Sequence, residues 1–501
     1  MNNKFLILAN SSSAALASVP LLSIGEFRTN LIQAVQEKHC RVSSFFAMPE
    51  KNDFRLIAVL ADDAAAKIYI TSAMTTERYP SLTVDVPAFH WFEREIHEQY
   101  GILPEGHPWL KPIRFQKKED GSGDKPQIGV TDYFQVKGST VHEVAVGPVH
   151  AGVIEPGHFR FQCLGEEVMH LEIELGYQHR GVEKMLLNAP DKKTIHIMET
   201  VSGDSSIAHA TAYAQLIESL DPSLVPSENA RKLRAAAAEL ERIANHTGDL
   251  GALAGDVAFL PTASYCGRIR GDYLNTTAIL CGNRFGRNFI VPGGIRQTIT
   301  PENTVEILKR LDTFQVELND ALHLMFDAPS VLDRFENTGK VPYETSVQIG
   351  MVGAAARASG DAQDIRKTHP YGAYKTINTE PVVAGNGDVL SRAEIRYKEI
   401  ETSHQLLRKL LAEIKETVEA VPMREPVLQS NSIAVSLTEG WRGEVCHVAI
   451  TGPDGKFCRY KITDPSFHNW FGLALALRGE AVSDFPICNK SFNLSYCGHD
   501  L

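Results

Sequence analysis

The sequence predicts an α+β domain followed by a larger, mainly helical-bundle domain that carries small β pieces. Two observations support this fold class. Short strand-like runs alternate with helical runs up to residue 115, whereas long amphipathic helices dominate beyond residue 200. Between these parts, residues 116–140 are polar and rich in Lys, Asp and Gly, which is typical of a linker. We therefore expect domains at residues 1–115 and 141–501, and a chain of 501 residues is long enough for them.

Individual elements can be placed by their hydrophobic periodicity. The first domain should contain an antiparallel sheet and one clear helix, at residues 5–8, 54–60 and 67–70 for the strands and 26–38 for the helix. The second should be a helix bundle with Ser227 as an N-cap and Pro301 in a first turn. Its long helices are expected at residues 205–220, 227–253, 301–326 and 392–420, and its strands at 144–150, 159–161, 433–436 and 444–450.

Composition excludes several classes of function. The net charge is −11 and no basic block stands out, so nucleic acid is not expected as a partner. The apolar stretch near the N-terminus lacks a preceding basic cluster and is interrupted by residues 9–13, so it predicts neither a secretion signal nor a membrane span. No G-x-G-x-x-G follows a strand, which argues against bound NADH.

The eight cysteines are scattered along the chain, and none lies two residues from another. This spacing predicts reduced, mostly buried thiols rather than a disulfide framework. It also provides no local iron–sulfur or zinc motif, so we expect any such cluster to lie in a neighbouring subunit. The cysteines are Cys40, Cys163, Cys266, Cys281, Cys446, Cys458, Cys488 and Cys497.

A polar stripe runs along the helix that follows Ser227. Offsets of four, three and seven residues place its members on one helix face: Arg242, His246, Asp249 and Asp256. Such a face would be solvated in an isolated helix. Because the surrounding residues are largely apolar, we expect the stripe to cross a buried bundle and to be paired internally. A buried carboxyl there responds strongly to a nearby charge, which makes Asp256 a candidate proton-handling group.

Two loops identify the chain with a known family. Residues 202–205 read SGDS and precede IAH and AY elements, and residues 464–469 read DPSFHN. The first resembles the metal-binding loop of [NiFe]-hydrogenase large subunits, where C-G-x-C stands at the same place. The second is similar to the complex I form of the hydrogenase D-P-C-x-x-C. All four thiolate positions are therefore vacant: Ser202, Ser205, Ser466 and Asn469. Since nickel prefers soft thiolates to hydroxyls, we expect no metal here.

Other motifs extend this resemblance over nearly the whole chain. Residues 89–102 resemble the W-F-E-R-E motif of the complex I 30-kDa subunit, and residues 147–150, 175–184 and 350–371 resemble elements shared by 49-kDa subunits and group 4 membrane-bound hydrogenases. From the residues alone, 175–184 could also form a solvated turn, and 89–102 is best interpreted as a docking helix without chemistry. The resemblance implies a 30-kDa-type domain fused to a 49-kDa-type or formate-hydrogenlyase-type domain.

The resemblance also implies candidate site residues. His150 and Asp256 are expected to be proton-linked, and Arg366 to be an electrostatic anchor. Tyr213 and His209 are the candidates for a quinone cavity, although a structural role for a buried tyrosine is an equal alternative. Complex I places a quinone-contacting histidine where this chain has Ile154.

The function that this resemblance implies is a subunit of a membrane-bound, energy-converting oxidoreductase complex. The expected partners are a small subunit with a [4Fe–4S] cluster, a ferredoxin-like subunit and antiporter-like membrane subunits. The chain would couple electron transfer from that cluster, with quinone as a candidate acceptor, to ion translocation. It would lie peripherally on the cytoplasmic side of the inner membrane. Two alternatives are an active [NiFe] hydrogenase large subunit and a non-redox scaffold.

Overall fold

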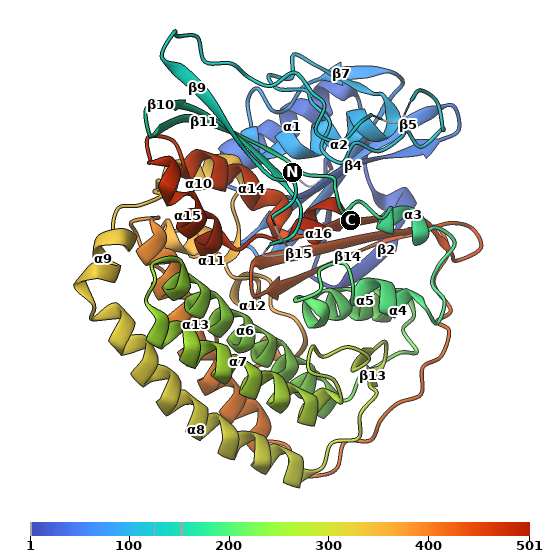
Figure 1. Ribbon diagram of the computed structural model, residues 1–501. Coiled ribbons are helices and arrows are strands. Elements are labelled where there is room, and N and C mark those ends of the chain that lie inside the picture. Colours follow the sequence, from blue (N-terminus) through green and yellow to red (C-terminus); the bar gives the residue numbers. More distant parts are fainter. Residues whose placement is uncertain (1–2, 125, 151–153) are drawn as a thin grey trace.

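A computed structural model describes residues 3–124, 126–150 and 154–501. Long helices gather at one end of the molecule, and the N-terminal sheet and a long β-ribbon lie at the other (Figure 1). The C-terminal strands β14 and β15 run between these two ends. The fold class predicted from the sequence, an α+β part followed by a mainly helical part with small sheets, is confirmed.

The N-terminal part is an antiparallel sheet covered by helices. Its strands follow the order β1-β6-β5-β4, and β3 adds in parallel to β6. Helix α1 begins at a capping box in which Ser23 and Glu26 satisfy each other's backbone N–H groups, and it buries Phe27, Leu31 and Ala34 along one face. The elements are β1 (Leu6–Leu8), β2 (Ser12–Ala15), β3 (Leu21–Leu22), α1 (Ile24–Gln36), β4 (Arg41–Glu50), β5 (Asp53–Asp62), β6 (Lys67–Thr75), β7 (Arg78–Pro80), α2 (His90–Tyr100) and β8 (Leu103–Glu105).

Four long helices form the bundle: α6 (Glu228–Asp256), α7 (Leu260–Cys281), α8 (Pro301–Phe326) and α13 (Val389–Ala412). Ser227 caps α6 by accepting from Ala230 N, and Pro301 occupies the first turn of α8, as predicted. Helix α7 was not expected, and α13 ends at Ala412 instead of continuing to residue 420. Beyond Ala412 the chain leaves the bundle and forms a β-bridge between Val418 and Ile299.

Shorter elements surround the bundle. Strands β9, β10 and β11 form an antiparallel ribbon, and β14, β15 and β16 form a hairpin-linked sheet. These strands are β9 (Val141–Val146), β10 (His158–Leu164), β11 (Glu167–Glu174), β12 (Ile290–Val291), β13 (Gly294–Ile295), β14 (Ser432–Gly440), β15 (Gly443–Thr451) and β16 (Phe457–Thr463). The remaining helices are α3 (Val182–Met185), α4 (Thr194–Met198), α5 (Ser206–Leu220), α9 (Pro329–Phe335), α10 (Tyr343–Ile349), α11 (Gly353–Ala358), α12 (Ile365–Thr368), α14 (Pro465–Ala476), α15 (Phe485–Phe492) and α16 (Tyr496–Asp500).

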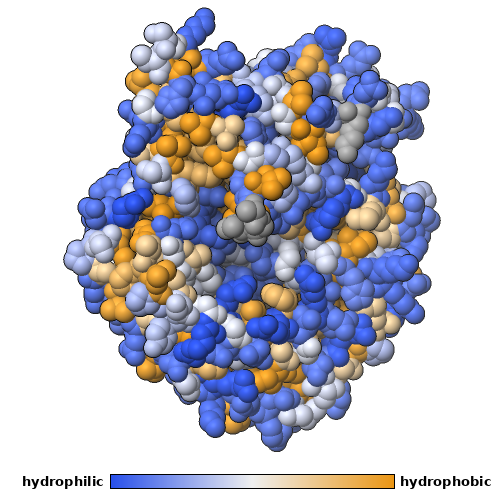
Figure 2. Space-filling view, in the orientation of Figure 1, coloured by the Kyte–Doolittle hydropathy of each residue, from blue (hydrophilic) through white to orange (hydrophobic). Residues whose placement is uncertain are grey.

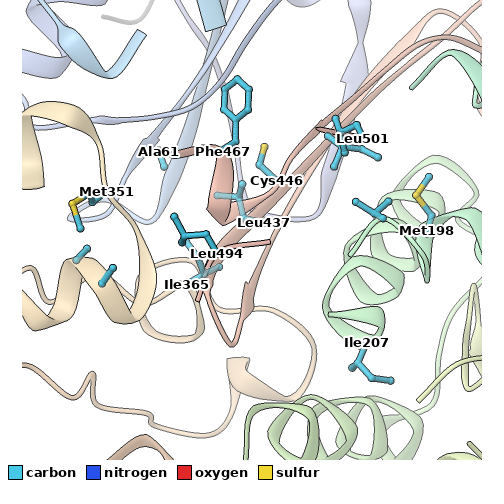
Figure 3. Packing of buried hydrophobic residues seen from close by; sticks show 14 of the residues in the cluster. Ala61, Met198, Ile207, Met351, Ile365, Leu437, Cys446, Phe467, Leu494 and Leu501 are labelled. Atoms are coloured by element: carbon cyan, nitrogen blue, oxygen red, sulfur yellow. The ribbon is translucent and has the colours of Figure 1, made fainter. Parts of the chain in front are cut away.

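The two parts of the chain are joined by more than a linker. The described residues between 116 and 140 form no helix or strand. However, β2 pairs with β14, so that an N-terminal strand completes the four-stranded sheet β16-β15-β14-β2. Figure 3 shows Ala61 of the N-terminal sheet near Cys446 of β15 and Phe467 of α14, all members of one hydrophobic cluster. Helix α2 packs into this junction, where Trp91 contacts Phe467, so it has the docking role that its sequence predicts.

The face of the molecule that Figure 2 shows is mostly hydrophilic. In the view of Figure 2, hydrophobic residues gather over the ribbon β9–β11 and near α14. Leu164, the last residue of β10, is 45% exposed, and Met169 of β11 is 42% exposed. In the described part of the chain, no helix has the length and apolar character that crossing a bilayer requires.

Candidate functional site

The residues at the vacant thiolate positions are buried and hydrogen-bonded within the protein. Ser202, on the loop before α5, lies 2.9 Å from Ser495 Oγ, and its hydroxyl donates to Asp204 Oδ1 at 3.1 Å. Ser466, in the first turn of α14, accepts from Ser495 N at 2.8 Å. We call Ser202, Ser466 and Ser495 the serine cluster. Its three side chains are at most 1% exposed, so each hydroxyl makes its contacts with protein rather than with bulk solvent.

The other two vacant positions also have protein partners. Asn469 makes a pair of hydrogen bonds with Val352, in which Oδ1 accepts from Val352 N at 2.9 Å and Nδ2 donates to Val352 O at 3.0 Å. Ser205 lies 3.5 Å from Arg442, whose guanidinium forms a bidentate pair with Asp204. Burial alone would raise the pKa of Asp204, but the charge of Arg442 and its hydrogen bonds hold that pKa below its usual value.

This donor set does not fit a nickel–iron centre. A neutral hydroxyl or amide is a hard donor, and these groups are already engaged with each other or with the backbone. Among the described residues, no group of three or more His, Cys, Asp or Glu side chains is arranged to hold a metal. Cys497, which belongs to neither of the two loops, also lies close to this site. Its Sγ is 3.4 Å from Ser495 Oγ, but burial raises its pKa to about 11, which keeps it a protonated thiol at neutral pH.

A buried chain of hydrogen bonds starts beside the serine cluster. Asp464 caps α14 by accepting from Ser466 N at 2.8 Å, and its other oxygen lies 3.0 Å from His209 Nε2. His209 Nδ1 lies 3.0 Å from His447 Nε2, and His447 Nδ1 lies 2.9 Å from the hydroxyl of Tyr460. We call Asp464, His209, His447 and Tyr460 the buried relay. None of its side chains is more than 1% exposed.

The chemistry of the relay fixes the direction of its hydrogen bonds. An ionised Asp464 can only accept, so His209 donates to it from Nε2, and a singly protonated His209 then accepts from His447 at Nδ1. His447 then accepts the Tyr460 proton at Nδ1. Burial lowers the pKa of His447 well below its usual value and raises the pKa of Tyr460, so both groups are neutral near pH 7. The relay is therefore a continuous row of donors that ends on one carboxylate.

A second group of buried charges crosses the helix bundle. Glu399 of α13 accepts from Arg357 Nε at 2.8 Å and from His246 at 2.8 Å, and it lies 3.5 Å from Arg242. Burial opposes ionisation of Glu399, but the charge of Arg357 and the His246 contact hold its pKa well below the usual value. The predicted pairing of Arg242 and His246 inside the bundle is confirmed, and Asp249 likewise pairs with Arg396 at 2.9 Å.

Arg366 extends this bundle network toward α12. Its guanidinium lies 3.0 Å from Glu239 and 2.7 Å from Asp364, and the side chain is only 3% exposed. Glu239 also accepts from Tyr374 Oη at 2.6 Å and from Ser403 Oγ at 2.5 Å. Arg366 is thus held between two buried carboxylates, and its expected role as an electrostatic anchor stays a prediction.

The bundle network approaches the Asp204 loop through α6. Asn245, one turn after Arg242, donates from Nδ2 to Asp204 O at 2.9 Å. The indole of Trp441 donates to the same oxygen at 2.9 Å, and its ring lies 5.9 Å from that of His246. One backbone carbonyl therefore receives hydrogen bonds from α6 and from the turn between β14 and β15, next to Ser205.

The remaining predicted residues lie in separate places. His150 follows β9, and its Nε2 is 2.8 Å from Gly157 O. Tyr213 is buried on α5, four residues after His209, and burial raises its pKa. Asp256 is the last residue of α6 and is exposed, so the structure does not bring it to the buried stripe. Both ring nitrogens of His209 already have partners, which gives a quinone contact at that residue no support.

Residues 175–184 are only partly solvated, since Val182 and Glu183 are buried whereas Arg180 and Lys184 are exposed. Glu183 accepts from Lys461 Nζ at 2.9 Å and from Arg459 at 3.1 Å. Burial opposes ionisation, but these two cations lower the pKa of Glu183 to about 2. Arg180 donates to the carbonyls of Thr200 and Val201 at 2.7 and 2.9 Å, which ties this tract to the loop that carries Ser202.

Sequence reasoning missed Glu241 as a candidate. This carboxylate, on α6, accepts from the backbone N–H groups of Ile207 and Ala208 at 2.7 and 3.3 Å, at the N-terminus of α5. Burial, together with the charge of Asp204, raises its pKa to about 8. The sequence signal for Glu241 is weak, because it stands directly before Arg242 and two residues after Glu239.

Comparison with known proteins agrees with this arrangement. Residues 26–124 match the family model of the respiratory-chain NADH dehydrogenase 30 Kd subunit, and residues 256–436 match that of the 49 Kd subunit. The carbon monoxide-induced hydrogenase of Rhodospirillum rubrum is 30% identical over 356 residues, which cover 71% of this chain and 98% of that protein. The chain belongs to the family of complex I 49-kDa subunits and membrane-bound hydrogenase large subunits.

Other members of this family match most of the chain, including its N-terminal part. Formate hydrogenlyase subunit 5 of Escherichia coli (strain K12) is 28% identical over 467 residues, or 87% of this chain and 80% of that protein. Hydrogenase-4 component G of the same organism is 28% identical over 445 residues, or 84% of this chain and 75% of that protein. The predicted fusion of a 30-kDa-type and a 49-kDa-type domain is confirmed by the two family models.

Proposed function

We propose that this chain is a metal-free, large-subunit-like component of a membrane-associated complex related to complex I and the group 4 hydrogenases. In this proposal a small subunit holds a [4Fe–4S] cluster near the serine cluster, and a change in the charge of that cluster shifts protons along the buried relay. A ferredoxin-like subunit and antiporter-like membrane subunits complete the assembly. The chain would bind peripherally, on the cytoplasmic side of the membrane, through these partners.

The observation that carries the proposal is the position of the relay. Asp464 holds both the first turn of α14, where Ser466 lies, and the imidazole of His209. Because the relay is sealed from water, a charge that arrives nearby is weakly screened and changes the energies of its protonation states strongly. Neutral His447 and Tyr460 can each pass a proton on without leaving a lasting buried charge. A catalytic metal is not needed for such a response.

Two further observations support an assembly of this kind. The hydrophobic residues over the ribbon β9–β11 form a surface that a protein partner would cover (Figure 2). The relatives include a protein named membrane-bound hydrogenase subunit alpha, from Pyrococcus furiosus, and an NADH-quinone oxidoreductase subunit from Thermus thermophilus. Quinone remains a candidate electron acceptor on this family evidence alone, since the hydrogen bonds of His209 do not favour it.

Elemental analysis of the purified complex tests the metal-free part of the proposal. The expected result is far less than one nickel per chain, together with no hydrogen evolution from reduced viologen. Nickel near one per chain, or hydrogen evolved by the complex, would overturn the proposal in favour of an active hydrogenase.

Substitution of His209 tests the coupling role. His209→Gln removes the only imidazole that joins Asp464 to His447, so proton-coupled turnover of the complex should fall by about 100-fold, which is typical for loss of a proton-transfer group. The matched control is His196→Gln, because His196 is a half-exposed histidine on α4 outside the relay. The EPR signal of the reduced cluster should be the same in both variants, which shows that the complex has assembled.

If His209→Gln leaves turnover unchanged in an assembled complex, the chain is a scaffold. Asp256→Asn in the same assay tests the separate prediction that this carboxyl handles protons. Because Asp256 is exposed and lies outside the relay, unchanged turnover in that variant would remove it from the proton path without affecting the role of His209.

A further inference from the structure

A cavity of about 410 Å³ lies between α5, the beginning of α6 and the 3-10 helix η3 (Gly372–Lys375). Its volume falls within the range of roughly 300–1,000 Å³ that is typical of small-molecule sites. No residue of the serine cluster or the buried relay lines it. The chemistry of its walls can therefore be considered apart from the redox role proposed above.

The interior of the cavity contains a buried hydrogen-bond donor without a partner. Gln215 of α5 is 8% exposed, and its Oε1 accepts from Ser11 Oγ at 2.9 Å. Its Nε2 has no acceptor among the residues that the structure describes. A buried amide N–H without an acceptor is unfavourable and rare in folded proteins, so an acceptor from a bound molecule would complete this group.

The charges around the cavity are unbalanced. Glu218 is neutralised by Arg234, which lies 2.7 Å away and also donates to two backbone carbonyls. Arg231 and Lys375 line the same cavity, and neither forms an ion pair within the described part of the chain. The net charge of the lining is therefore positive, and it favours an anion.

The rest of the wall is apolar or aromatic. Leu224 and Ala235 are buried side chains on two sides of the cavity, and the tyrosines Tyr371 and Tyr374 lie against it with their ring centroids 5.1 Å apart. An inorganic anion would leave these surfaces without contacts. A molecule with a hydrocarbon or aromatic body would remove them from water.

We propose that this cavity binds a small organic monoanion, namely a carboxylate that carries an apolar body. Its carboxylate accepts from Gln215 Nε2 and is held by the positive charges of Arg231 and Lys375. Its body packs against Leu224 and the two tyrosines. A guanidinium recognises a carboxylate more strongly than a neutral hydroxyl because their hydrogen bonds are charge-assisted.

The position of this site links it to the bundle network. Tyr374 donates to Glu239 Oε1 at 2.6 Å, and Tyr371 accepts from Glu439 N at 3.0 Å. Both carboxylates belong to the buried charges around Arg366 and Arg357. A ligand that packs on these rings would thus be separated from the bundle network by one tyrosine side chain at each of these two contacts.

Calorimetric titration of the full-length chain with octanoate tests this inference. Saturable binding is expected, with 1-octanol and octylamine at least about tenfold weaker because they lack the carboxylate charge. Gln215→Leu, which keeps the shape but removes the donor, and Arg231→Gln should each weaken octanoate by about tenfold. Lys375→Gln should also weaken it. Lys309→Gln is the matched control, because Lys309 is an exposed lysine on α8 that does not line the cavity.

Each other outcome of the titration decides against the site. Absence of saturable octanoate binding overturns it, and so does binding of 1-octanol or octylamine as tight as that of octanoate. If Gln215→Leu fails to fold, as judged by far-UV circular dichroism, Arg231→Gln carries the test because its side chain is only partly buried. Octanoate affinity that is unchanged in Arg231→Gln and Lys375→Gln overturns the charge argument. None of these results depends on the metal content or the turnover of the complex.

Discussion

Glu399 is the residue whose removal should be most damaging to the helix bundle. Its carboxylate contacts Arg357 at 2.7 Å, His246 at 2.8 Å and Arg242 at 3.5 Å, and it is 1% exposed. Glu399→Gln preserves the size of the side chain but leaves positive charge in the interior without its main counter-charge. We expect a clear loss of folding free energy without a change of fold.

The size of this loss can be worked from the contacts that remain. Removing one member of a buried ion pair costs about 3–5 kcal/mol. Arg357 keeps Glu439 at 2.8 Å, and Arg242 keeps Glu239 at 3.5 Å, so neither guanidinium is left wholly unpaired. We therefore expect the lower end of that range, about 3 kcal/mol.

Urea unfolding of the purified chain measures this loss. Tryptophan fluorescence and far-UV circular dichroism should give the same transition, which allows the shift in midpoint to be converted to free energy. The matched control is Glu394→Gln on the same helix, because Glu394 is 40% exposed and pairs with Lys398 at 3.5 Å. That control should change stability by less than about 0.5 kcal/mol. Equal midpoints for the two variants would refute the reasoning.

Three further predictions concern stability. The pKa of Glu241 is about 8 in the folded chain and 4.5 ordinarily, so the stability that its protonated form contributes is complete below pH 4.5 and is lost as the pH rises to 8. The urea midpoint of the wild type should therefore fall between pH 4.5 and pH 8 relative to that of Glu241→Gln. Gly353→Ala should prevent stable folding, since its φ is +68° and a Cβ would overlap the carbonyl oxygen of Arg442, whereas Gly372→Ala, with open space around it, should cost only about 1–2 kcal/mol in the same assay. Ser227→Ala should cost about 1 kcal/mol, measured by urea unfolding, because α6 loses its N-cap.

The helices that the sequence predicts best are those with clear caps and an apolar face. The starts of α6 and α8 follow from Ser227 and Pro301, whose preferences act within one turn of the chain. Helix α7 escaped prediction because its buried face includes Thr262, Cys266 and Thr276 instead of an uninterrupted apolar stripe. The end of α13 was misplaced because the chain is drawn into a bridge with Ile299, a contact made over a hundred residues away.

The candidate site, too, has features that follow from the sequence and features that depend on contacts between distant parts of the chain. The resemblance to the hydrogenase loops implied that Ser202 and Ser466 would lie together, and helical spacing indicated that the α6 stripe would be internally paired. It could not indicate that Ser495 connects the two serines, or that His447 and Tyr460 continue the contact from His209, because strand pairing and helix packing bring these residues together. Asp256 shares the helical spacing of its stripe, but it lies at the last turn of α6, where the bundle no longer covers it.

The pairing of β2 with β14 has a consequence for how the polypeptide can be divided. A protease cut within residues 116–140 would break the backbone but not the pairing of β2 with β14. The ion pair of Arg41 with Glu444, at 2.6 Å, would also still join the two fragments. The two fragments should therefore co-elute in gel filtration and separate only in denaturant. Conversely, a gene that encoded only the larger fragment would produce a sheet with an open edge at β14, which is prone to self-association.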